Sequence, residues 1–173
     1  NAKKLIDTGV TGIAYETVTS SDGSMPLLAP MSTIAGQLAF VVGSYHLLKH
    51  NKGKGVMIGH MDDMDPRVVT VIGAGVAGTQ SILKAIDNKA LVKVVDSSQS
   101  KLDDLKSKYG TENVEYILSS KDSIQVSVNE SDLVIGSVYV VGKEAPKVVT
   151  KEMLSSMNPV SYTHLRAHET QRN

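Results

Sequence analysis

Short apolar runs alternate with amphipathic stretches through the middle and C-terminal parts of the chain. Runs rich in valine, isoleucine and leucine predict buried strands at 68–72, 91–95, 114–118 and 133–135. Stretches in which polar and apolar positions mix predict helices at 76–86, 98–109 and 151–157. Strands that alternate with helices form right-handed βαβ units around a parallel sheet. The pattern therefore predicts an α/β fold built on a doubly wound parallel sheet.

The beginning of the chain follows a different pattern. The clearest helix is predicted over Met31–His50, where one face carries the apolar residues Ile34, Leu38, Val41, Tyr45 and Leu48. Ser32 or Thr33 can cap its start, and Gly53 and Gly55 end it. The stretch Gly9–Val18 predicts a short buried strand, and Ser20–Pro30 a loop. These features predict that 1–30 is the remnant of a second, substrate-binding domain and that 31–50 connects it to an incomplete sheet domain at 51–160.

The last residues do not continue the strand and helix pattern. Asn158, Pro159 and Val160 lead toward another strand, but the sequence that follows, SYTHLRAHETQRN, is polar and basic. It resembles translated vector or adapter sequence, so we expect 161–173 to be a non-native tail without a strand. A natural frayed terminus is the alternative. Because Asn1 is not an initiator methionine, we also expect the chain to start inside a longer protein.

Composition narrows the classes of function. The chain has 173 residues with 18 basic and 18 acidic side chains, so no basic excess favours nucleic acid or a membrane surface as a partner. No run approaches the roughly 18 apolar residues of a membrane span. The absence of cysteine excludes disulfides and thiolate catalysis and agrees with a cytoplasmic location.

A glycine-rich turn after the first predicted strand carries the main chemical signal. In Val71-Ile72-Gly73-Ala74-Gly75-Val76-Ala77-Gly78 the glycines have the spacing G-x-G-x-x-G. Gly73 allows the tight turn, Gly75 lets the backbone approach a pyrophosphate, and Gly78 lets the helix pack closely on the sheet. The helix that begins near Val76 then directs free N–H groups at the phosphates. The sequence therefore predicts a Rossmann-type fold that binds a dinucleotide.

An acidic residue stands where this fold needs one. Asp96 follows the second predicted strand, eighteen residues after Gly78. Its carboxylate can accept hydrogen bonds from the adenosine ribose and would repel a 2′-phosphate, so NAD is favoured over NADP. The alternative is that Asp96 only caps the next helix. Lys101 either lies beside this ribose or is a solvated helix lysine, and Val138 either contacts a cofactor ribose or is a buried valine.

Two groups of residues could suggest metal ligands. His60, Asp62, Asp63 and Asp65 are more simply a solvated acidic loop. His164 and His168 have the i, i+4 spacing of zinc ligands on a helix, but they lie in the suspected tail. We therefore expect no metal site.

Several motifs outside the glycine turn together carry a family resemblance. The stretches GVTGIAYETV, MPLLAPMSTIAGQLA, GKGVMIG, VIGAGVAGT and GKEAPKVVTKEML resemble successive motifs of the alanine dehydrogenase branch of the alanine dehydrogenase/pyridine nucleotide transhydrogenase family, in the same order. The resemblance covers the chain from about Asn1 to Val160. One local departure is HMDDMDP after GKGVMIG, where the family often has an uncharged, glycine-rich loop.

The resemblance implies reversible, NAD-dependent oxidative deamination of L-alanine to pyruvate and ammonium by a homohexamer. It also implies NAD contacts at Ser32, Gly75, Val76, Asp96, Lys101, Ser119 and Val138. The family's substrate-binding lysine and arginine and its catalytic histidine correspond to sequence before Asn1, and its catalytic aspartate to sequence after Val160. We therefore expect no catalytic residue in this chain. The NAD-binding subunit of a proton-translocating transhydrogenase and a non-catalytic nucleotide-sensing module are the alternatives.

Overall fold

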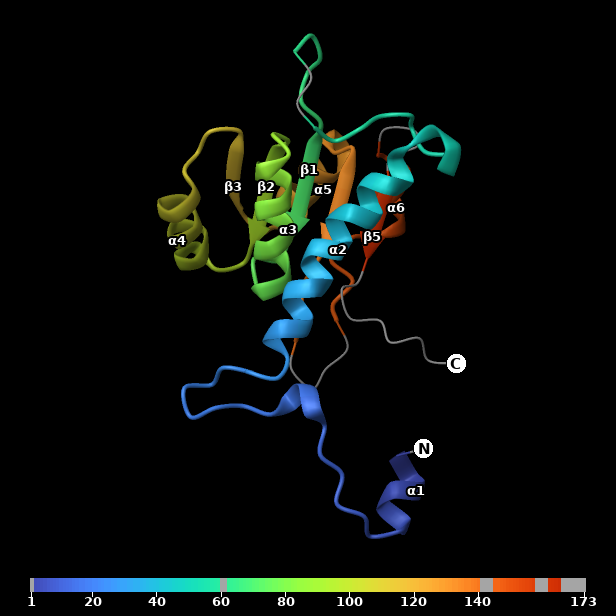
Figure 1. The fold of residues 1–173 in the computed structure, drawn as a ribbon, viewed down its shortest axis with the longest axis vertical. Helices are drawn as coiled ribbons and strands as arrows, with labels where there is room; N and C mark the ends of the chain where they lie inside the picture. The colour runs from blue at the N-terminus through green and yellow to red at the C-terminus, as the bar shows by residue number, and fades with distance from the viewer. Residues whose placement is uncertain (1, 60–61, 141–144, 158–161, 166–173) are drawn as a thin grey trace.

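One parallel sheet organises the molecule (Figure 1). The computed structural model describes residues 2–59, 62–140, 145–157 and 162–165. The strands stand in the order β3-β2-β1-β4-β5. Their bounds are β1 Val68–Ile72, β2 Leu91–Asp96, β3 Val114–Leu118, β4 Leu133–Gly136 and β5 Tyr162–Leu165. The predicted Rossmann-type α/β fold is confirmed, and the first four strands lie where the sequence predicts them.

Helices cover both faces of the sheet (Figure 1). The described helices are α1 Ala2–Asp7, α2 Ala29–Leu47, α3 Val76–Asp87, α4 Gln99–Tyr109, α5 Lys121–Glu130 and α6 Lys151–Ser155, with short 3-10 turns η1 Tyr15–Thr17 and η2 Lys49–Asn51, and α2 to α6 are the ones that cover the sheet. One face packs its side chains, such as Val69 and Val71, against α2, α3 and α4. The other face, which includes Ile72, packs against α5 and α6. Both faces of the central strands are therefore buried, as their largely apolar sequence predicts.

The order of the strands creates a crevice at one edge of the sheet. The chain runs from β1 to β2 and β3 on one side and then crosses to β4 on the other. In register, Ile72 at the end of β1 lies between Val95 of β2 and Gly136 of β4. In sheets of this kind ligands bind at such a reversal, beyond the carboxyl ends of the strands. The residues that follow β1, β2 and β4 are therefore brought together there.

Helix α2 differs from its sequence-based prediction in where it begins and in which face it buries. It begins at Ala29, two residues before the predicted start, because Pro30 lies in its first turn, where a proline is tolerated. Neither Ser32 nor Thr33 is its cap. Its apolar residues Ile34, Leu38, Val41 and Tyr45 are each more than half exposed. The buried face instead carries four small residues, Ser32, Gly36, Ala39 and Gly43, and two large ones, Phe40 and Leu47.

Small residues on that buried face allow α2 to lie very close to α3. A Cβ atom on Gly36 would overlap with the carbonyl oxygen of Ala77 in the first turn of α3. The Ser81 hydroxyl donates to the Gly36 carbonyl at 2.7 Å, and the amides of Gln37 and Gln80 are 3.1 Å apart. The middle of α2 is therefore fixed against the first two turns of α3, which follows the glycine turn.

The N-terminal residues do not form the predicted strand. Gly9–Val18 has no strand, contains only the turn η1, and is exposed throughout. Figure 1 shows α1 and this segment extending away from the sheet. The prediction is wrong because a strand needs a neighbour to pair its backbone groups, and no described strand lies beside this segment.

Helix α5 was not predicted from the sequence. Ile124, Val126 and Val128 alternate with polar residues, which is the pattern of a strand. In the structure Ile124 and Val128 are buried one helical turn apart, and Val126 is 53% exposed. Ser120 and Ser123 form a reciprocal capping box that fixes the start of the helix.

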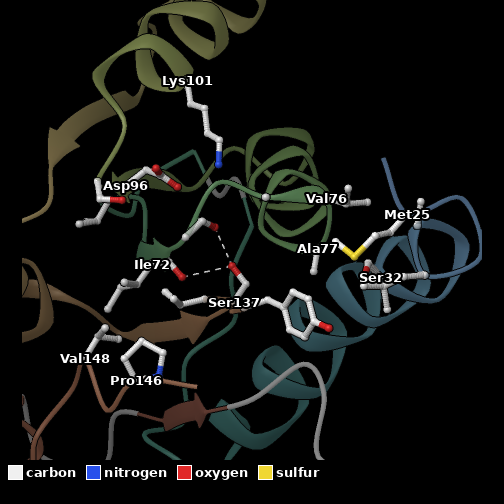
Figure 2. Close-up of a pocket in the computed structure, with 18 of the residues that line it drawn as sticks. Met25, Ser32, Ile72, Val76, Ala77, Asp96, Lys101, Ser137, Pro146 and Val148 are labelled. Atoms are coloured by element: carbon white, nitrogen blue, oxygen red, sulfur yellow. Dashed lines mark hydrogen bonds between the residues drawn. The ribbon is translucent and has the colours of Figure 1, made fainter. Parts of the chain in front are cut away.

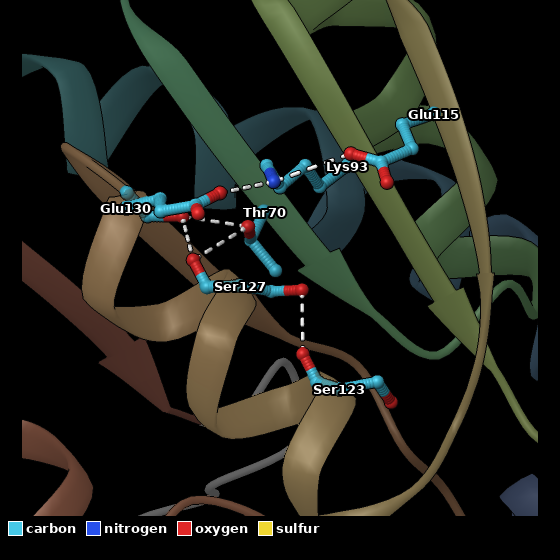
Figure 3. A network of polar contacts seen from close by, with 7 residues as sticks. Thr70, Lys93, Glu115, Ser123, Ser127 and Glu130 are labelled. Atoms are coloured by element: carbon cyan, nitrogen blue, oxygen red, sulfur yellow. Dashed lines mark hydrogen bonds and ion pairs between the residues drawn. The ribbon is translucent and has the colours of Figure 1, made fainter.

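Polar contacts join α5 to the sheet (Figure 3). The hydroxyl of Thr70 in β1 lies 2.6 Å from the hydroxyl of Ser131. The Ser131 hydroxyl donates a hydrogen bond of 2.6 Å to the carbonyl of Ser127 in α5. Lys93 of β2 forms an ion pair with Glu130 at the end of α5. These contacts satisfy buried hydroxyl groups and hold α5 across β1 and β2.

The predicted absence of a strand after Val160 is also wrong. The backbone of Tyr162–Leu165 forms β5, which pairs in parallel with β4 from Leu133↔Tyr162 to Gly136↔Leu165. Tyrosine, threonine and leucine are compatible with a strand, and the open edge of β4 supplies its partner. The rest of the predicted tail, 161 and 166–173, lies outside the described residues, and its non-native origin stays a prediction.

Candidate dinucleotide-binding site

The glycine turn has the geometry that its sequence predicts. Strand β1 ends at Ile72 and α3 begins at Val76, so only three residues reverse the chain direction. Gly73 has a φ angle of +97°, a conformation that favours glycine. A Cβ atom on Gly78 would overlap with the Gly73 carbonyl oxygen. Gly73 is therefore needed for the turn, and Gly78 for the close packing of α3 on it.

The start of α3 offers hydrogen-bond donors to a ligand. Gly75 is its N-cap residue and makes no side-chain capping bond. The first backbone N–H groups of any α-helix have no partner within the helix, and they carry the positive end of its dipole. No atom lies within 4 Å of the position that a Cβ on Gly75 would take. The turn is therefore open to an anionic group such as a diphosphate.

The carboxylate of Asp96 lies against this turn. It is only 8% exposed, and its Oδ2 accepts a hydrogen bond of 2.6 Å from the backbone N–H of Ala74. Its Oδ1 accepts one of 2.9 Å from the N–H of Ser98. The side chain of Ser98, rather than that of Asp96, caps α4. The alternative that Asp96 is only a helix cap is therefore wrong.

A pocket of about 840 Å³ lies in front of the turn (Figure 2). Eight of the nine residues predicted to contact a cofactor line it: Ser32, Gly73, Gly75, Val76, Asp96, Lys101, Ser119 and Val138. The ninth, Gly78, lies behind the turn and acts through packing. The structure thus brings together residues from α2, α3, α4 and the ends of four strands, β1 to β4.

The remaining lining residues approach from different sides. Ser32, on the first turns of α2, is 5% exposed. Lys101 lies in the first turn of α4, and Figure 2 shows its side chain reaching toward the pocket beside Asp96. Ser119 follows β3 and donates its backbone N–H to the Asp96 carbonyl at 2.9 Å. Val138 follows β4 and is partly buried against the apolar core.

Sequence reasoning missed several residues of the pocket wall. These are Met25, Leu28, Ser137, Tyr139, Pro146 and Val148. Ser137 stands out because its hydroxyl donates to the Gly73 carbonyl at 2.6 Å. Its position directly after β4 was the available signal, because residues after strands at the reversal of strand order face the crevice.

Three features of the pocket are compatible with a bound dinucleotide: its volume, the space at the glycine turn and the free capacity of the Asp96 carboxylate. Its volume lies within the usual range for ligand sites, about 300–1,000 Å³. The open space at Gly75 forms a cradle that a side chain at this position would fill, and the close packing at Gly78 holds α3 against the turn. A carboxylate offers about four lone-pair positions. Asp96 uses two of them on backbone N–H groups and keeps capacity for two ribose hydroxyls.

Other kinds of site have less support in the described part of the chain. It contains no group of three or more His, Asp or Glu side chains placed to hold a metal ion. Three of the histidines that the sequence offers as metal ligands lie outside the described residues: His60, His168 and the side chain of His164. Among the described helices, none is long and apolar enough to cross a membrane.

Comparison with known proteins agrees with this geometry. Residues 39–162 match the family model described as alanine dehydrogenase/PNT, C-terminal domain. An alanine dehydrogenase from Halomonas elongata is 43% identical over 159 residues, which are 92% of this chain and 43% of that protein. One from Mycobacterium tuberculosis is 44% identical over 156 residues, 90% of this chain and 42% of that protein. The chain thus spans less than half the length of these relatives.

Solved structures give the same result. An L-alanine dehydrogenase superposes with a TM-score of 0.85 at 36% identity, over 94% of this chain and 45% of that one. A transhydrogenase from Sinorhizobium meliloti superposes with a TM-score of 0.75 at 24% identity, over 92% and 47%, and shows a shared fold. The matched family implies that the cofactor is a pyridine nucleotide. The chain therefore belongs to the alanine dehydrogenase/PNT family and carries the C-terminal domain of that family.

Proposed function

We propose that this chain is the NAD-binding part of an alanine dehydrogenase. The intact enzyme would catalyse the reversible oxidative deamination of L-alanine to pyruvate and ammonium in the cytoplasm, as a homo-oligomer. The observation that carries the proposal is the Asp96 carboxylate, which lies 2.6 Å from the Ala74 N–H at the mouth of the glycine turn. The identities of 43% and 44% to proteins named alanine dehydrogenase support the substrate.

In this proposal each part of the pocket binds one part of the cofactor. The N-terminal N–H groups of α3 bind the diphosphate, and Gly75 lets it approach the backbone. Asp96 accepts hydrogen bonds from the two hydroxyls of the adenosine ribose, and Lys101, Ser119 and Val138 line the same region. Ser32 reaches the cofactor from α2, which is held against α3 through Gly36.

NAD supplies a hydride acceptor when it is bound, and this chain's residues bind and orient it. The buried Asp96 favours NAD over NADP, because a 2′-phosphate beside a carboxylate with little access to water meets strong repulsion. Lys101 is a nearby cation that reduces this discrimination without removing it. The proton transfers at alanine need a general acid/base, for which we propose groups of the intact enzyme outside these residues.

Calorimetric titration of the 173-residue chain tests this proposal. We expect weak, saturable binding of NAD, with binding of NADP weaker by about tenfold, which corresponds to about 1.4 kcal/mol. Equal or tighter binding of NADP, or no binding of either, would contradict it. With NAD and L-alanine, the same preparation should give no increase in NADH absorbance, because hydride transfer needs the substrate held against the nicotinamide. Alanine-dependent NADH formation would show that the catalytic groups lie within this chain after all.

A further inference from the structure

A single peptide group in the glycine turn is held at both of its polar atoms by side chains. The peptide between Gly73 and Ala74 has its carbonyl oxygen on Gly73 and its N–H on Ala74. The carbonyl accepts a hydrogen bond of 2.6 Å from the Ser137 hydroxyl, and the N–H donates one of 2.6 Å to Asp96 Oδ2. Figure 2 shows this bond together with a longer contact of 3.2 Å from the same hydroxyl to the Ile72 carbonyl.

These two side chains come from the strands on either side of β1. Asp96 ends β2, and Ser137 follows β4 directly. Backbone bonds continue the same arrangement, because Gly73 N–H donates to the Val95 carbonyl at 2.7 Å and Ser137 N–H donates to the Ile72 carbonyl at 2.8 Å. The peptide is therefore fixed by residues 22 and 64 positions away in the sequence.

A peptide group next to a glycine rotates more freely than one between two other residues, so its orientation depends more on hydrogen bonds such as these. Gly73 adopts a positive φ, and glycine has access to many more backbone conformations than other residues. Rotation of the peptide would move its carbonyl oxygen toward the Asp96 carboxylate and away from its donor, Ser137. In the observed orientation the carbonyl accepts from the Ser137 hydroxyl and packs closely against Gly78 in the first turn of α3.

We propose that Ser137 is a positioning residue for the pyridine nucleotide. Its hydroxyl orients the Gly73–Ala74 peptide, with Asp96 as the counterpart at the N–H, and thereby sets the shape of the cradle for the cofactor diphosphate. The proposal deepens the proposed NAD-binding function and rests on it. Ser137 does not need to touch the cofactor to have this effect.

Removal of the hydroxyl tests the restraint before any ligand is added. In Ser137→Ala, amide hydrogen exchange measured by NMR should become about threefold to tenfold faster at Ala74, the effect of one hydrogen bond of usual net strength. Ser137→Cys should behave similarly, because it keeps the size of the side chain and donates poorly. Ser155→Ala is the matched control, because Ser155 is exposed and also donates to a backbone carbonyl, that of Lys151 at 3.0 Å. An unchanged rate at Ala74 in both Ser137 variants would overturn the restraint.

Ligand binding separates positioning from general stability. The dissociation constant for NAD should rise about threefold to tenfold in Ser137→Ala, and that for adenosine should change less than about twofold, since adenosine lacks the diphosphate. An equal loss for both ligands would indicate a merely structural role and overturn the proposal. Absence of NAD binding by the unsubstituted chain would overturn the proposed function and the positioning role together, whereas the exchange rate reports on the restraint alone.

Discussion

Replacement of Gly78 by alanine is expected to abolish NAD binding and to lower the free energy of unfolding by about 3 kcal/mol or more. The added Cβ would overlap with the Gly73 carbonyl oxygen and lie 2.6 Å from the Ser137 Oγ. Backbone on one side and a bound side chain on the other leave α3 no room, so the helix must move away from the turn. Urea denaturation and calorimetric titration with NAD measure the two effects.

Comparison with Gly75→Ala separates the effect on stability from the effect on NAD binding. A Cβ at Gly75 meets no atom within 4 Å, so the fold should tolerate it with a change of less than about 0.5 kcal/mol. NAD binding should nevertheless weaken by about tenfold or more, because the methyl group occupies the path of the diphosphate. Equal stability of Gly78→Ala and the unsubstituted chain would contradict the close approach of α3.

Asp96→Ala should weaken NAD binding by about a hundredfold and lower the free energy of unfolding by about 2 kcal/mol. The substitution removes the acceptor for the ribose hydroxyls and also leaves the Ala74 N–H without its partner. A side chain that only contacts the ribose would lower affinity without lowering stability. The same two measurements, with NADP as a second ligand, distinguish these cases.

The control for Asp96→Ala is Asp103→Ala. Asp103 is exposed on α4 and accepts a hydrogen bond from the Gln99 side chain at 2.9 Å, away from the pocket lining. We expect its replacement to leave NAD affinity unchanged. If Asp96→Ala bound NAD as tightly as the unsubstituted chain, the proposed ribose contact would be wrong.

The strands of the sheet could be predicted from sequence because each central strand is buried on both faces. Val68–Ile72 and Leu91–Asp96 are largely apolar, interrupted by Thr70 in the first and Lys93 in the second, and few other structures accommodate such runs between glycine and polar segments. The short helix α5 could not be predicted so easily. Its Ile124, Val126 and Val128 alternate like a strand, and only the packing of α5 on β1 decides which of them is buried.

Errors at the ends of the chain have a related cause. Gly9–Val18 has the residue types of a strand, but nothing described lies beside it to pair with. Tyr162–Leu165 lacks a strong apolar pattern, but β4 offers an open edge. Pairing partners are tertiary information, so local sequence predicts the ends of a sheet less well than its centre.

The residues of the pocket likewise differ in how far local sequence predicts them. Gly73, Gly75 and Asp96 were predictable because their spacing is set by one βαβ unit. The place of Ser137 directly after β4 indicates only that it lies near the crevice, and its role depends on a hydrogen bond to a residue 64 positions earlier. The exposure of the apolar face of α2 could not be predicted either. Helical periodicity shows which residues share a face, but it does not show which face the protein buries.

NMR titration of the isotope-labelled chain with NAD tests the central claim most directly, because it reports on each backbone amide. Our account predicts that the largest shifts occur at Gly75, Val76 and Ala77 at the start of α3 and at Asp96 and Ser97 after β2. They should saturate together with one dissociation constant. Shifts confined to other surfaces, or no saturable shift at the turn, would contradict the assignment of this pocket to a dinucleotide.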